Sequence, residues 1–308
     1  MSPFSVQRAR SSLRLYGRTF GLFIAMGLGA LFTEARVLSP LIPWLVAMML
    51  FLASLDLRLG PGALRTGVWK IFAAELILAI LGYAALAAVD RDLALVAFLT
   101  AITPTAISAP VIIGFLGGRV DYVVTSVLLT NVAVALALPL LLPLATGAGG
   151  QIAPGEVFGA VCFVVLVPLA LARCAAWLPA AAGRAIARAK PLSFPLWLVA
   201  LLLVTAKSVY VVGHEETVTG GRLLAIAAVA FGVCVASFAL GALLGGRTYR
   251  REASQSLGQK NNSFTIWIAL TFVSPVVALG PTCYVLYHNV YNSLQLMAHE
   301  RRRARSGD

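Results

Sequence analysis

The chain has 308 residues, of which 60% are hydrophobic and only 12% charged, and its formal net charge is +12. This composition excludes a soluble globular domain of that length and indicates a polytopic membrane protein. The basic residues fall in short clusters between apolar runs, as cytoplasmic membrane flanks do, so we expect a lipid bilayer as the partner and no nucleic acid.

In chain order, residues 1–16 predict a basic cytoplasmic arm on the anionic inner leaflet, because arginines alternate with apolar residues there. Ten apolar segments follow, and residues 298–308 predict a basic cytoplasmic tail. We expect each apolar segment to be a membrane-spanning helix. Their approximate boundaries are 17–34, 39–56, 69–89, 93–117, 121–144, 155–177, 192–213, 221–245, 252–273 and 276–297.

The distribution of Lys and Arg predicts the orientation. With the N-terminus inside, the cytoplasmic flanks carry 19 of these residues and the opposite flanks carry 3. Lys207 and Lys260 lie within spans. This asymmetry favours ten spans with both termini cytoplasmic, in a multi-pass protein of the inner or plasma membrane.

Two of the spans are interrupted at equivalent positions. Pro104 and Pro110 interrupt the fourth span, since proline removes a main-chain donor and blocks helical continuation. Gly258 and the polar residues 259–263 interrupt the ninth, about 154 residues later, which is half the chain. Five spans in each half would place the second half upside down. We therefore predict an all-α fold of two inverted five-helix repeats, 17–144 and 145–297, with broken, crossing helices 4 and 9, as in many transporters.

Lys260 is predicted to lie deep in the membrane, roughly 13 Å from an arginine anchor at ~1.5 Å per helical residue. An ionisable residue at such a depth indicates a functional site with a partner. Glu75 is the one acid well inside a span, about 9 Å from the same side. We expect a Lys260–Glu75 pair; the alternatives are a Glu75 that reaches the inner interface or one that is protonated and hydrogen-bonded elsewhere.

Half-helix N-termini that meet at the midplane offer free amides and partial positive charge to a carboxylate. Together with Lys260, they favour a small organic anion as the solute. The alternative is that the polar residues near the breaks only cap the helix ends, and that the two candidates in the last span only support the ninth. The candidate solute-binding residues are Thr105, Ser108, Gln259, Asn261, Asn262, Ser263, Thr265, His288 and Asn289.

The chain resembles the bile acid:sodium symporter family. The resemblance rests on the layout, on Gly258-x-x-Asn261, on the segment from Tyr287-His288-Asn289 to Asn292-Ser293, and on the start of the second span at residues 41–50. It implies a panel domain of helices 1, 2, 6 and 7 and a core domain of helices 3–5 and 8–10. Substrate would bind between them, beside the crossing, and one domain would move against the other.

Departures from the family pattern concern its sodium sites. By that resemblance, Ser256 stands where a sodium-binding glutamate belongs, Lys260 and Glu75 stand where glutamines belong, and Ala109 and Pro110 replace a Ser-Asn pair. We therefore expect a secondary active transporter of a small organic anion that is not driven by sodium. Lys260 and Glu75 would either couple it to protons or act as a structural strut. The alternatives are a sodium-coupled organic anion symporter and, in another class, an anion channel or uniporter.

We do not expect an enzyme. Ser256 and Lys260 are four residues apart and could form a Ser-Lys dyad, but nothing else in the chain supports hydrolysis. No cofactor is expected. The four cysteines are scattered in apolar runs without metal spacing, so we expect small core residues and no metal site.

Overall fold

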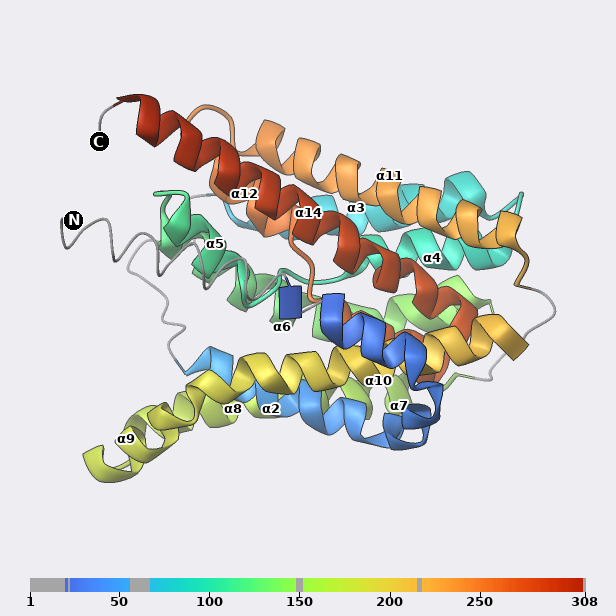
Figure 1. The fold of residues 1–308 in the computed structure, drawn as a ribbon, viewed down its shortest axis with the longest axis horizontal. Coiled ribbons are helices and arrows are strands. Elements are labelled where there is room, and N and C mark those ends of the chain that lie inside the picture. Colours follow the sequence, from blue (N-terminus) through green and yellow to red (C-terminus); the bar gives the residue numbers. More distant parts are fainter. Residues whose placement is uncertain (1–19, 22, 56–66, 148–151, 215–217, 307–308) are drawn as a thin grey trace.

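The computed structural model describes residues 20–21, 23–55, 67–147, 152–214 and 218–306 (Figure 1). The predicted basic arm, residues 1–16, lies outside these ranges. Within them every regular element is a helix, which confirms the all-α class. Six helical runs of the described residues are long and apolar enough to cross a membrane, so the protein is a multi-pass membrane protein. They are Thr33–Ser54, Trp69–Leu86, Val120–Thr146, Pro154–Cys174, Ala181–His214 and Gly220–Leu244.

The first half of the chain begins with a helical stretch over residues 23–31. Its elements are η1 (Thr33–Leu41), α2 (Ile42–Ser54), α3 (Trp69–Leu86), α4 (Arg91–Ile102), α5 (Ala109–Phe115) and α6 (Val120–Thr146). Those of the second half are α7 (Pro154–Val161), η3 (Cys162–Leu166), α8 (Val167–Cys174), η4 (Ala175–Trp177), α9 (Ala180–Arg188), η5 (Lys190–Leu192), α10 (Ser193–His214), α11 (Gly220–Leu244), α12 (Arg250–Gly258), α13 (Asn262–Phe272) and α14 (Pro275–Ser306).

The helices form two layers (Figure 1). The α2 layer consists of α2, α7, α8 and α10, in which α10 and α8 both pack against α2. The α14 layer consists of α3, α4, α11, α12 and α14, in which α3 packs against α4, and α11 against α12 and α14. Between them, α6 contacts α3 and α12 on one side and α7 on the other.

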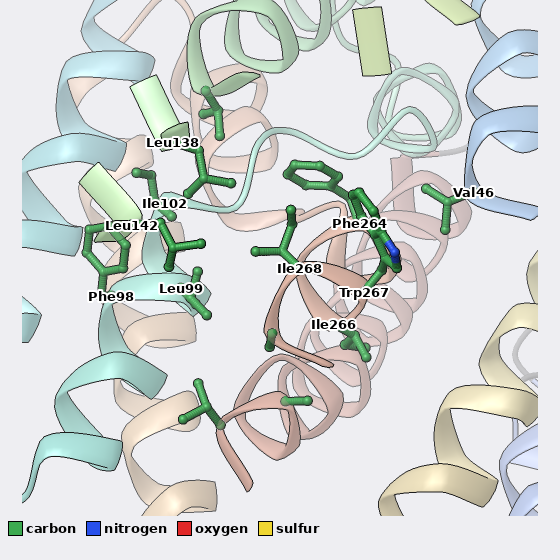
Figure 2. Packing of buried hydrophobic residues seen from close by; sticks show 14 of the residues in the cluster. Val46, Phe98, Leu99, Ile102, Leu138, Leu142, Phe264, Ile266, Trp267 and Ile268 are labelled. Atoms are coloured by element: carbon green, nitrogen blue, oxygen red, sulfur yellow. The ribbon is translucent and has the colours of Figure 1, made fainter. Parts of the chain in front are cut away.

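An apolar cluster fills the region where α13 meets both layers (Figure 2). Phe264 and Ile268 of α13 lie beside Leu99 of α4 and Leu138 of α6. Lipid is as apolar as these side chains, so close packing rather than escape from water holds such helices together. Gly241 of α11 shows how close the approach is, because a Cβ there would lie 2.5 Å from the Ala253 carbonyl oxygen of α12.

Several predicted boundaries were wrong. The last helix, α14, continues beyond the predicted end of the tenth span, residue 297, through Ser306. The predicted sixth span contains the π-helical turn η3 before Pro168, whose missing N–H prevents a regular α-helical ladder there. The short helix α9, between the sixth and seventh segments, was not predicted. Cys174 is exposed and therefore is not a core residue.

Candidate functional site at the helix crossing

The two predicted interruptions are present, and they meet. Residues 103–108 separate α4 from α5, and residues 259–261 separate α12 from α13. The two segments run antiparallel with Thr105 opposite Lys260. On either side of this bridge, Ala106 N–H donates to the Gln259 carbonyl and Asn261 N–H donates to the Pro104 carbonyl, both over 2.8 Å. Main-chain groups released by one break are thus satisfied by the other, as a low-dielectric environment requires.

Side chains fix Thr105 in this arrangement. Its Oγ1 donates to the Ser256 carbonyl (2.6 Å), and its N–H donates to Thr130 Oγ1 (3.0 Å). Asn131 Nδ2 donates to its carbonyl (3.0 Å). Thr265 Oγ1 donates to another hydroxyl, that of Thr103, over 2.7 Å. Thr105 and Thr265 therefore hold the crossing together, and neither borders the cavity described below.

The predicted helix breakers have different roles. Pro104 lies in the first break, but Pro110 is the second residue of α5, where its missing N–H costs nothing. Pro110 thus lies at the start of the helix that follows the break. Gly258 is the last residue of α12, and its carbonyl accepts a hydrogen bond from Tyr284 (2.7 Å). A Cβ at Gly258 would lie 2.3 Å from the Phe238 ring, so only glycine fits without rearrangement.

Lys260 and Glu75 are in contact. Lys260 Nζ lies 3.1 Å from Glu75 Oε1, and both side chains are 0% exposed. The same nitrogen donates to the Ala101 carbonyl (2.9 Å) at the end of α4. That carbonyl would accept from the N–H of Thr105 if the helix continued, but Thr105 N–H bonds to α6 instead. The ammonium therefore neutralises a carboxylate and satisfies a main-chain group left over by the break.

The Lys260 ammonium points towards Glu75 and not into the cavity beside the crossing. Lys260 borders the cavity at the crossing, yet its side chain is completely buried, so its main chain forms that part of the wall. Its charge is therefore used within the protein, in the predicted pair with Glu75. Ser256 Oγ has no hydrogen-bond partner in the described part of the chain, so Ser256 and Lys260 form no dyad.

A cavity of about 320 Å³ lies between the two layers, beside the crossing. One wall is apolar and comes mainly from α2 and α10. The other carries amides, hydroxyls and an imidazole from the two breaks and from α14. The apolar wall includes Val46, Met49, Leu50, Phe194 and Trp197; the polar wall includes Ser108, Gln259, Asn261, Asn262, Ser263, His288, Asn289 and Asn292.

Internal hydrogen bonds order the polar wall but leave some of its groups without partners. Gln259 Nε2 donates to Ser108 Oγ (2.8 Å), and Asn262 Nδ2 lies 3.4 Å from His288 Nδ1. Within the described residues, Gln259 Oε1 and Asn262 Oδ1 are buried and have no partner. Asn289 Nδ2 instead donates to the Val285 carbonyl of its own helix (2.6 Å). Both unpaired atoms are hydrogen-bond acceptors at the tip of the second break.

Sequence reasoning missed the apolar wall and Asn292. Phe194 and Trp197 are unremarkable in an apolar run, and only the fold shows that they face a break more than 60 positions later. Asn292 belongs to a polar pattern in the last span, and that pattern could have identified it.

No protein-family model matches this chain, and no curated protein compared with it is similar. The site must therefore be interpreted from its own geometry.

Proposed function

We propose that this protein is a secondary transporter of a small organic anion that works by alternating access and is not driven by sodium. The observation that carries the proposal is the cavity between the two layers, bordered by two interrupted helices. Interrupted helices at a midplane cavity are typical of transporters, because irregular backbone in a membrane is tolerated only where protein or water surrounds it.

The chemistry of the cavity supports an amphipathic anion. Asn261, Asn262 and Ser263 border it at the N-terminus of α13, an 11-residue helix whose cap makes no side-chain hydrogen bond. Free amides and the helix dipole at such an end favour negative charge. No carboxylate borders the cavity among the described residues. The opposite wall of α2 and α10 suits an apolar carbon skeleton.

Two features support movement of one layer against the other. The breaks lie half a chain apart, as expected if residues 17–144 and 145–297 are inverted repeats with ten crossings in total. The distribution of Lys and Arg favours cytoplasmic termini. With that orientation the cavity, which reaches Ala53 at the end of α2 and Ser193 at the start of α10, would open towards the cytoplasm. The motifs of the ninth and tenth spans support membership of the bile acid:sodium symporter family with altered sodium sites.

The buried ammonium argues against sodium drive. A sodium ion 4 Å from Lys260 Nζ would be repelled by about 4 kcal/mol at an effective dielectric constant of ~20. The pair also belongs entirely to the α14 layer, with Glu75 on α3 and the third partner on α4. Movement between layers would leave it intact and sealed, so the pair acts as a strut rather than as a proton carrier. We therefore favour a carrier that moves its solute down its own gradient.

The first experiment is a thermal-shift screen of purified protein against organic anions, with sodium and pH varied in each well. A ligand stabilises the state that it binds according to its concentration relative to its dissociation constant. Trp197→Leu should reduce the shift caused by a hit, whereas the exposed Trp69→Leu should not.

Uptake of that hit into proteoliposomes then tests the mechanism. We expect saturable uptake with trans-stimulation and no acceleration by an inward sodium or proton gradient. Uptake that follows an imposed sodium gradient would refute the proposal, and non-saturating flux would indicate a channel.

A further inference from the structure

The short helix α9 contributes no residue to the cavity. In the chain, α9 lies between α8 and α10, and both of these helices belong to the α2 layer. Figure 1 shows it projecting beyond the ends of α2 and α8. The run Ala181–His214 begins within α9 and, with 34 residues, is longer than the ~20 that a bilayer requires, so we place its α9 end at the bilayer surface.

The helix is amphipathic. Arg184 and Arg188 are one turn apart and both are exposed, so they share one face. Ile186 lies on the opposite face and is half-buried. Just before the helix, Trp177 is 84% exposed and Leu178 is 45% exposed. Tryptophan at the end of a membrane-crossing run is typical of the interface, where its ring contacts both acyl chains and headgroups.

The stretch of sequence that contains α9 carries no acidic residue. No acid occurs between Glu156 and Glu215, while Arg184, Arg188 and Lys190 fall in and beside the helix. Among the described residues, no ion pair involves either arginine of α9. Two exposed guanidinium groups beside an exposed indole are complementary to anionic phosphate groups at a membrane surface.

We propose that α9 and Trp177 form a binding surface for the headgroups of anionic phospholipids in the surrounding bilayer. The arginines contact the phosphodiester groups, and Trp177 inserts at the boundary between headgroups and acyl chains. Because α9 joins two helices of one layer, the contact ties the α2 layer to the membrane surface. This inference is independent of the transport proposal, since it rests on a different surface and requires no solute.

A local fluorescent probe tests the proposal on the full chain. Gly183 lies on α9, and a Cβ there meets nothing within 4 Å, so Gly183→Cys can carry a fluorophore without disturbing packing. The label is placed in a chain whose four native cysteines are replaced by alanine, in nanodiscs that contain phosphatidylglycerol and phosphatidylcholine. Quenching by doxyl-labelled phosphatidylglycerol is compared with quenching by doxyl-labelled phosphatidylcholine, and the ratio reports the headgroup preference at α9.

We expect a preference for phosphatidylglycerol that decreases about 30-fold in R184Q/R188Q, from ~1 kcal/mol per basic residue near an anionic surface. High salt should weaken it in wild-type protein. The matched control is R247Q/R250Q, in the other layer. Both arginines are exposed; Arg247 lies in the loop before α12, and Arg250 is the first residue of α12. The control should keep the preference at Gly183→Cys unchanged.

Three outcomes would overturn the proposal: equal quenching by both lipids, no quenching by either, or an equal loss in the control. No quenching by either would place α9 away from lipid, as expected if a protein partner or water covers it. If the cysteine-free chain does not fold, the tryptophan emission lost in Trp177→Phe, measured with the same two quenchers in the native chain, decides between the same outcomes.

Discussion

Replacing Lys260 by methionine removes the ammonium that neutralises Glu75 and satisfies the Ala101 carbonyl, without a large change in volume. A carboxylate that is 0% exposed then remains without its counter-charge. Removing one partner of a buried ion pair typically costs ~3–5 kcal/mol. Glu75→Leu leaves the ammonium unpaired and should cost a similar amount.

The double variant E75L/K260M distinguishes this reasoning from a simple loss of packing. Replacing both members of a buried pair by apolar residues of similar size is often neutral. What remains is the Ala101 carbonyl, which has no other donor because the Thr105 N–H bonds to Thr130. An unsatisfied buried polar group costs ~1–3 kcal/mol. We therefore expect the double variant to be more stable than either single variant, although the single losses would add to ~6–10 kcal/mol.

The measurement is equilibrium unfolding in mixed micelles with increasing denaturing detergent, monitored by tryptophan fluorescence. Single variants as stable as wild type would show that the pair is not sealed from water. A double variant whose loss of stability equals the sum of the two single losses would show that the side chains act independently. Either result would refute the proposal that the pair acts as a strut.

Other predictions concern the crossing itself. Gly258→Ala should cost ~1–3 kcal/mol of stability, because its Cβ would lie 2.3 Å from the ring of Phe238, and a smaller residue at 238 should recover part of it. Thr105→Val keeps the shape but removes the donor to the Ser256 carbonyl, which is then left unsatisfied, at a cost of ~1–3 kcal/mol. Tyr284→Phe removes the donor to the carbonyl that ends α12 and should cost a similar amount.

Matched controls exist for each change, and all can be followed by the same unfolding measurement. Gly232→Ala places a Cβ where no atom lies within 4 Å, so it should not reduce stability. Thr205→Val removes a hydroxyl that bonds only within its own helix. Tyr287→Phe removes a hydroxyl that makes no hydrogen bond within the described residues. Equal losses in a test variant and its control would contradict the assigned role of that residue.

The sequence predicted those features that depend on depth and composition. The Lys260–Glu75 contact followed because one acid lies at the required depth, and the two breaks followed from proline and glycine inside apolar runs. The position of the cavity depends on how the segments cross, so the sequence did not show that this pairing leaves the Lys260 side chain outside the cavity. The sequence did not show that Pro104 lies within the break while Pro110 lies in the first turn of the next helix, because proline is compatible with both positions.

The main-chain pairing at the crossing also constrains biosynthesis. The Pro104 carbonyl and the Ala106 amide find their partners at Asn261 and Gln259, more than 150 positions later in the chain. At ~5–20 residues per second, the ribosome needs roughly 8–30 s to supply them. During that interval Thr130 and Asn131 of α6 can already bond to Thr105. The Pro104 carbonyl and the Ala106 amide still lack their partners. The crossing can therefore close only after residues 259–261 have been synthesised.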